Sequence, residues 1–157
     1  MPEKAKKNDI SYLREIEIKY KKRKSSSGEA NKPIRAAEQV VELFSDLQNE
    51  SKEKMIAINL DAKCRILCFE VVAIGSVSSL YTRPMEVFRT AFPVNAHGAI
   101  VIHNHPSGDP SPSQDDEKFT QKLLNMSNDM GLVFFDHIII GEDGYYSFAE
   151  HGKLDDQ

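Results

Sequence analysis

An unbroken apolar run that ends in a histidine pair constrains the fold of this chain more than any other feature. Residues 98–103 read GAIVIH and lie between turn-forming residues. A run that is apolar at nearly every position, and not at every second one, predicts a strand buried on both faces of a sheet. The segment 132–140, LVFFDHIII, predicts a second strand of this kind. The chain must therefore supply helices that cover the sheet.

The other periodic segments supply these helices and more strands. Apolar residues at helical spacing follow Pro33, and they recur most regularly from Phe119 to Met130, where Gly131 ends the pattern. A shorter helix is predicted for residues 84–92. Further strands are predicted for four segments: 14–24 (charged and apolar residues alternate, typical of a sheet edge), 54–60, 64–75 and 145–150. This order predicts an α/β (α+β) domain of three layers, with a mixed sheet flanked by helices.

Charge divides the chain into a basic tail and an acidic body. We expect a polar tail over residues 1–32, disordered over 1–10, then one domain over 33–150 and an acidic C-terminal tail over 151–157. Residues 1–24 hold nine basic and four acidic residues, a balance of +5, and the remainder holds 11 basic and 20 acidic residues, a balance of −9. Such a body does not suit a phosphate backbone. Nucleic-acid binding should therefore be weak or indirect, and it should depend on residues 1–24.

Hydropathy and the two cysteines indicate a cytoplasmic protein without a membrane partner. No apolar stretch approaches the length that spans a bilayer, and the first ten residues lack the apolar segment of a signal peptide. Cys64 and Cys68 are four positions apart in a predicted strand, which places their Cα atoms roughly 13 Å apart. A disulfide needs less than about 7 Å. We therefore expect two buried thiols.

His103 and His105, at the end of the first apolar run, are candidate metal ligands. They are two positions apart, so on an extended chain their imidazoles point to the same side. Catalytic zinc sites take three protein ligands and keep a fourth position open. The third ligand could come from the acidic residues that follow, and spacing alone does not choose among Asp109, Asp115, Asp116 and Glu117.

The same acidic stretch also has a purely structural explanation. Ser113 and Asp116 occupy the positions of a helix capping box, and acidic residues are favoured at a helix N-terminus. This explanation accounts for the start of a helix. It leaves the two neighbouring imidazoles unexplained, so the combination favours a metal site.

The full pattern resembles a known family. His103-Asn104-His105-Pro106, six residues, then Ser113 and Asp116 match H-x-H-P-x6-S-x-x-D, and this resembles the metal signature (JAMM motif) of JAB/MPN domains. With DHIIIG and YYSF downstream, residues 33–150 closely resemble the RadC family of that group. The resemblance implies a JAB/MPN-like, cytidine-deaminase-like fold. It also implies one Zn²⁺ ion held by His103, His105 and Asp116.

The resemblance further implies a zinc metallopeptidase. Zinc-activated water would cleave an amide or isopeptide bond in an unknown protein or peptide substrate. Ser113 would stabilise the oxyanion. For the carboxylate that transfers the proton, we favour Glu86, in the run PMEV, over Glu70, whose charge lies in an apolar strand. His137 is either a hydrogen-bonded core histidine or a residue that orients a ligand.

Two other functions compete with this interpretation. Separately, the sequence assigns no role to His97 or His151. The family's traditional label suggests a DNA-repair or DNA-metabolism accessory protein, whose metal site is structural or acts on a non-protein substrate. Longer RadC proteins carry an N-terminal helix-hairpin-helix region, for which the polar tail leaves no room, so we expect a short form. A non-catalytic interaction module would typically lose the ligands, whereas this chain keeps all three. The oligomeric state is not predicted.

Overall fold

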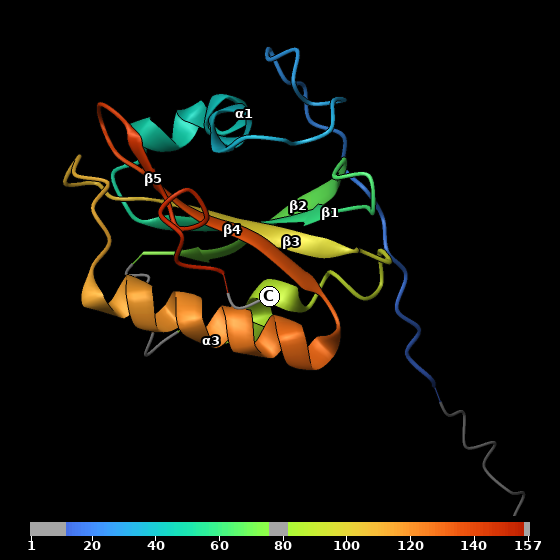
Figure 1. Ribbon diagram of the computed structural model, residues 1–157. Coiled ribbons are helices and arrows are strands. Elements are labelled where there is room, and N and C mark those ends of the chain that lie inside the picture. The colour runs from blue at the N-terminus through green and yellow to red at the C-terminus, as the bar shows by residue number, and fades with distance from the viewer. Residues whose placement is uncertain (1–11, 76–81, 156–157) are drawn as a thin grey trace, which may run out of the picture.

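A five-stranded mixed sheet with helices on both faces forms the centre of the molecule (Figure 1). The computed structural model describes residues 12–75 and 82–155. The strands are β1 (Lys54–Leu60), β2 (Ile66–Ile74), β3 (Gly98–Asn104), β4 (Val133–Ile140) and β5 (Tyr145–Ser147). The helices are α1 (Ala37–Leu43), the 3-10 helix η1 (Ser45–Asn49), α2 (Pro84–Phe88) and α3 (Gln114–Met130). The three-layer α/β architecture is confirmed.

The strand order β2-β1-β3-β4-β5 places β3 at the centre of the sheet. β3 and β4 are parallel and connected through α3, whereas the other neighbouring pairs are antiparallel. Every residue of β3 is buried, as the apolar run predicted. The two histidines therefore lie at the carboxyl end of a central strand, where open α/β sheets commonly place their ligand sites.

Each face of the sheet has its own apolar core, because side chains alternate along the strands. On β3, Ala99 and Val101 pack with α2 and α3, whereas Ile100 and Ile102 pack with α1. His103 is the next residue on the same side of β3 as Ala99 and Val101. It therefore faces α3, as does every second residue of the neighbouring strand β1, beginning with Met55.

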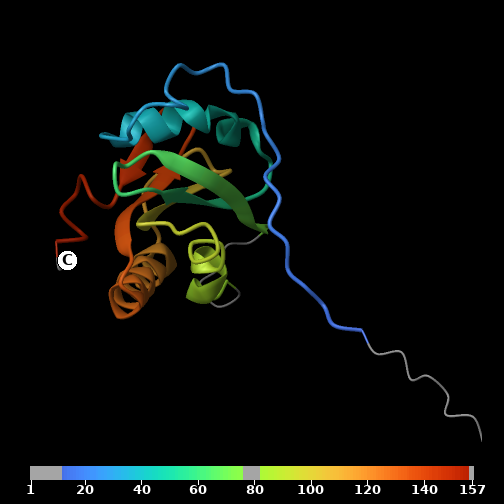
Figure 2. The ribbon, with the colours of Figure 1, turned by 90° about the vertical axis from the view of Figure 1, so that its right-hand side faces the viewer.

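The predicted edge strand in residues 14–24 is wrong. In the described part of this segment the chain is extended but forms no strand, and Ile16 is 91% exposed. Alternating residues need a neighbouring strand before they can pair, and here the chain runs away from the sheet (Figure 2). The predicted disorder of residues 1–10 falls outside the described residues.

Two helices are shorter than their sequence patterns predicted. α1 begins at Ala37 and not at Pro33, because the Gln39 side chain accepts hydrogen bonds from the backbone N–H groups of Arg35 (2.6 Å) and Ala36 (3.2 Å) and fixes the start there. α2 ends at Phe88, where a turn-type bond from the Ala91 N–H to the Phe88 carbonyl replaces the helical pattern. None of the helices in the described ranges is long and apolar enough to cross a membrane.

The two cysteines are unpaired but not fully buried. Cys64 lies in the turn before β2 with a φ of +59°, and its carbonyl accepts a bond from the Ile34 N–H (2.8 Å). Cys68 lies on β2, and its sulfur accepts from the Asn59 amide at 3.6 Å. Both thiols are half-buried, because one belongs to a surface turn and the other to the outermost strand.

Candidate metal centre

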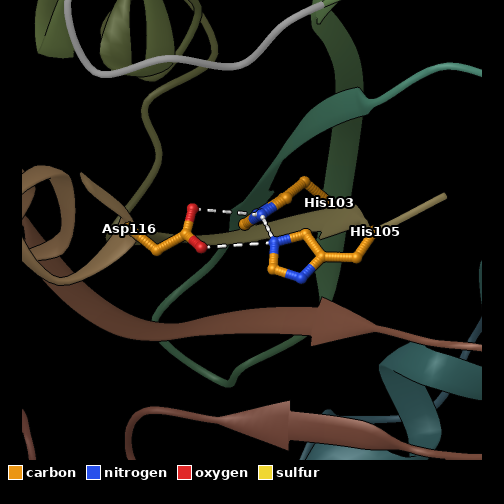
Figure 3. A group of neighbouring side chains, drawn as sticks. All are labelled: His103, His105 and Asp116. Atoms are coloured by element: carbon orange, nitrogen blue, oxygen red, sulfur yellow. Dashed lines mark hydrogen bonds and ion pairs between the residues drawn. The ribbon is translucent and has the colours of Figure 1, made fainter. Parts of the chain in front are cut away.

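Three side chains converge at the carboxyl end of β3 (Figure 3). His103 is on β3, His105 follows the strand directly, and Asp116 is in the first turn of α3. The His103 Nε2 atom lies 3.1 Å from the His105 Nε2 atom and 3.3 Å from Asp116 Oδ1. The His105 Nε2 atom lies 3.2 Å from Asp116 Oδ2. The structure thus brings together the three residues that the motif singles out.

These separations fit a tetrahedral metal ion. Ligand atoms about 2.0–2.1 Å from a tetrahedral zinc ion are about 3.3 Å from one another. One donor atom from each of the three side chains lies within 4.8 Å of the others. Two imidazole nitrogens and a carboxylate oxygen are also a donor set that zinc prefers. The geometry and the chemistry of the group therefore fit a metal ion.

The charges of the group also suit a cation. Burial opposes ionisation of Asp116, but its hydrogen bonds with His103 and His105 outweigh burial and lower the pKa of the carboxyl well below its usual value. The bond to Asp116 raises the pKa of His105, against the effect of burial, and the nearby charge of Glu53 adds to the rise. The site therefore holds a carboxylate that is ionised throughout the physiological range. Without a metal, the raised pKa of His105 favours its protonated form.

A buried chain of hydrogen bonds orients His103. Its Nδ1 atom lies 2.8 Å from His137 Nε2, and His137 Nδ1 lies 2.7 Å from the Thr120 hydroxyl, which donates to the Asp116 carbonyl at 2.7 Å. Burial lowers the pKa of His137 well below its usual value, so this ring is neutral. When His103 Nε2 binds a metal, its Nδ1 must carry the proton and donate to His137 Nε2. Each donor in this series of hydrogen bonds then has an acceptor. The last acceptor is the carbonyl of Asp116, the third candidate ligand.

A second set of contacts orients His105. Its Nδ1 atom lies 2.9 Å from the carbonyl of Asp109 and donates to it, so Nε2 keeps the lone pair that faces the site. The loop that carries Asp109 packs against the turn after β4, where Gly108 accepts from the Glu142 N–H at 2.8 Å. A side chain at Gly141 would meet the Gly108 carbonyl and Pro110, whose Cδ atom would be 2.7 Å away. Close packing of two loops therefore fixes the position of His105.

Thr120→Val should weaken zinc binding by roughly 10–100-fold without unfolding the protein. Valine has nearly the shape of threonine but cannot accept the proton of His137 Nδ1, so the ring that orients His103 loses its fixed tautomer. Competition with a chromophoric chelator measures the affinity. Ser127→Ala is the control, because Ser127 is also a buried hydroxyl on α3 but bonds only to its own helix, at the Leu124 carbonyl (2.8 Å). Equal affinities in the two variants would contradict the orienting role.

Gly141→Ala should destabilise the fold by about 1–3 kcal/mol, the usual cost of overpacking, and also weaken zinc binding. The new methyl group displaces the loop at Gly108 and Pro110, and that loop carries the carbonyl that holds His105. Urea unfolding and chelator competition measure the two effects. Gly144→Ala is the matched control, since nothing lies within 4 Å of a Cβ atom there. If the two alanine variants behave alike, loop packing does not support the site.

Ser113 forms the capping box that the sequence predicted. Its Oγ accepts from the Asp116 N–H at 3.1 Å and donates to Asp116 Oδ2 at 2.8 Å, and its own N–H also donates to Oδ2 at 2.8 Å. The Asp116 carboxylate thus takes part both in the helix cap and in the candidate metal site. The predicted role of Ser113 at an oxyanion stays a proposal.

The two glutamates considered for proton transfer are held by arginines. Glu86 caps α2: it accepts from the Arg83 N–H at 3.0 Å, and this bond lowers its pKa. Glu70 accepts from the Arg89 guanidinium, with Nε at 3.0 Å, and its other oxygen is buried without a hydrogen-bond partner among the described residues. The contacts described for the two carboxylates join them to these arginines and not to the ligand group.

A third glutamate, which sequence reasoning missed, interacts electrostatically with the candidate ligand His105. β1 pairs antiparallel with β3, with Met55 opposite His103, so the residue before β1, Glu53, continues this register opposite His105. Its charge contributes to the raised pKa of His105. Asn104 fixes this segment: its Oδ1 accepts from the Lys54 N–H at 2.8 Å, and its amide donates to the Lys52 carbonyl at 3.1 Å. Glu53 thus lies on the same face of the sheet as the two histidines.

The fold and the candidate metal ligands together are those of a JAB/MPN-type domain, and comparison with known proteins identifies the family. The sequence profile of the RadC-like JAB domain matches residues 34–153, and the chain belongs to this family. It is 39% identical over 127 residues to a UPF0758 protein of Aquifex aeolicus (81% of this chain, 55% of that protein). It is 45% identical over 109 residues to one of Protochlamydia amoebophila (69% and 47%). The chain spans about half the length of the curated relatives it matches.

Proposed function

We propose that this chain is a zinc-dependent hydrolase that cleaves an amide or isopeptide bond in a protein or peptide. The main support is the convergence of His103, His105 and Asp116, each with a partner that aims one ligand atom at a common point. Three N or O ligands with one position left open are typical of catalytic zinc sites, whereas structural zinc sites are usually closed by four ligands. A zinc ion held here would supply a Lewis acid and make water a competent nucleophile near neutral pH.

The chain itself would supply proton transfer and oxyanion binding. A general base must accept the proton of the attacking water and pass it to the leaving amine. The sequence favoured Glu86, and that assignment stays a prediction. Glu53 is the stronger candidate, since it is half-buried, lies opposite His105 and is electrostatically coupled to it. Ser113 is proposed to turn its hydroxyl from Asp116 towards the oxyanion, where such a donor typically contributes about 10²–10³ in rate.

Metal depletion and reconstitution test the proposal. Protein stripped of metal would be assayed by mass spectrometry against peptides and isopeptide-linked lysine conjugates, before and after zinc is restored. We expect cleavage that depends on zinc and is absent in His103→Ala. Zinc-loaded protein that cleaves no member of the panel would favour the alternative function, in which the metal is structural or the substrate is not a protein.

Three further expectations stay predictions. They are a cytoplasmic location, a domain that spans residues 33–150, and nucleic-acid binding that is weak, salt-sensitive and dependent on residues 1–24. Sequence-specific DNA binding that survives deletion of that segment would show the charge argument to be wrong.

A further inference from the structure

Two segments carry most of the large apolar side chains that the described residues expose. Ten such side chains are exposed, and eight of them belong to the segment 12–20 or to β2. The eight are Tyr12, Leu13, Ile16, Ile18, Tyr20, Leu67, Phe69 and Ile74. Isolated exposed apolar residues are ordinary on a protein surface, but two clusters of them point to an interaction.

The first segment, residues 12–20, has the pattern of a strand but no partner strand. Glu15, Glu17 and Lys19 alternate with Ile16, Ile18 and Tyr20, which gives an extended chain one apolar side and one charged side. No backbone hydrogen bond joins it to another part of the described chain. Figure 2 shows it running past the end of β2 and away from the body. The segment thus presents a strand-like apolar side to solvent.

The second segment, β2, is an edge of the sheet. It comes first in the strand order, so only one of its sides is paired within the described chain, with β1. An unpaired strand edge is a template for another strand. At about 3.3 Å per residue, the nine residues 12–20 and the nine residues of β2 each extend roughly 30 Å, so the lengths match.

The direction of the chain favours a second copy over the segment's own β2. Residues 23–25 border a groove of about 300 Å³ beside Phe69 and Val71, and Ser27 is fixed to α1 through a 2.7 Å bond to Glu42. Because the segment runs past the end of β2 and away from it (Figure 2), the chain would have to reverse within residues 12–24 to follow its own β2. That stretch contains no glycine, proline, asparagine or aspartate, the residues that form tight turns.

Charge does not oppose this association. Residues 12–20 carry two basic and two acidic residues, so the segment itself is neutral, and the four basic residues 21–24 that follow it are attracted to a body with a balance of −9. We propose that two copies exchange residues 12–20, each adding them as an edge strand to β2 of the other and closing a twofold dimer. The proposal does not depend on the metal or on hydrolysis.

The mass of the full chain in solution, measured by light scattering over a range of concentrations, tests the dimer. We expect a dimer, and we expect Ile16→Lys/Ile18→Lys to weaken it by at least about tenfold, because each buried apolar side chain contributes a factor of ten or more. Met85→Lys/Phe92→Lys is the matched control, since these two residues are the other exposed large apolar side chains and each is 54% exposed. A monomeric wild type, or equal loss of dimer in both variants, would overturn the proposal.

Cross-linking then identifies the contact. Isotope-labelled and unlabelled protein are mixed, incubated and treated with an amine cross-linker, and the linked peptides are identified by mass spectrometry. We expect mixed-isotope links between Lys19 or Lys21 of one copy and Lys63, in the turn before β2, of the other. Links within single-isotope molecules only would show that the segment covers its own β2, and mixed-isotope links between tails only would show a tail-to-tail dimer. Either result would overturn the exchange.

Discussion

Protein that carries His103→Ala should purify without stoichiometric zinc. His103 is 1% exposed, supplies one of the three ligand atoms, and is the ligand that the buried hydrogen-bond chain orients. Losing a ligand should cost more than the roughly 10–100-fold that loss of a supporting partner costs. Elemental analysis of purified protein measures the metal content. Zinc should also raise the melting temperature of the wild type and not of the variant, since a ligand at 1,000 times its Kd adds about 4 kcal/mol to stability.

Two further variants separate the metal from the fold. His97→Ala should keep its zinc, because His97 is exposed and its ring lies beside Phe135, 6.2 Å between ring centres, and not in the ligand group. Full metal occupancy in the double variant His103→Ala/His105→Ala would contradict the site. In that case zinc would bind elsewhere in the chain.

The sequence predicted the ligand group because its information is local. His103 and His105 share a strand end, and Asp116 opens the next helix. Spacing left four acidic residues open as the third ligand, and the resemblance to the JAMM motif selected Asp116. Thr120 could have been found in the same way, since it lies one helical turn after Asp116 and so on the same face of α3. The unbroken apolar run of β3 likewise predicted its central position.

Features that depend on pairing between distant segments could not be predicted. Glu53 is 50 positions before His103, and only the register of β1 against β3 brings it opposite His105. The strand prediction for residues 14–24 failed for a related reason. Alternation shows that a segment can form a strand, but not whether a partner strand is present in the same chain. The Glu86 pattern is local, and the structure shows this residue as a helix cap at the start of α2.

Glu53→Gln should keep zinc and lose at least about 10²-fold in hydrolysis, the lower range of what a general base contributes. Glutamine has the shape of glutamate but cannot accept a proton, and Glu53 is not among the three ligands, so metal content should stay that of the wild type. Turnover and zinc content are measured together, on whichever substrate the panel identifies. Asp116→Ala is the contrasting variant, which should lose activity because it loses the metal.

Glu86→Gln and Glu70→Gln are the matched comparisons, because each removes one carboxylate charge by an isosteric change. Both should stay active if Glu53 is the base, since glutamine can still accept the Arg83 N–H bond at the start of α2 and, on β2, the Arg89 guanidinium bond. A dead, zinc-loaded Glu86→Gln beside an active Glu53→Gln would return the role to the residue that the sequence favoured. If zinc-loaded Glu70→Gln is the inactive variant and the other two are active, the general base is Glu70, on β2. Full activity in all three zinc-loaded variants would remove a glutamate base from the mechanism, and the proton would then have to leave through Asp116 or the solvent.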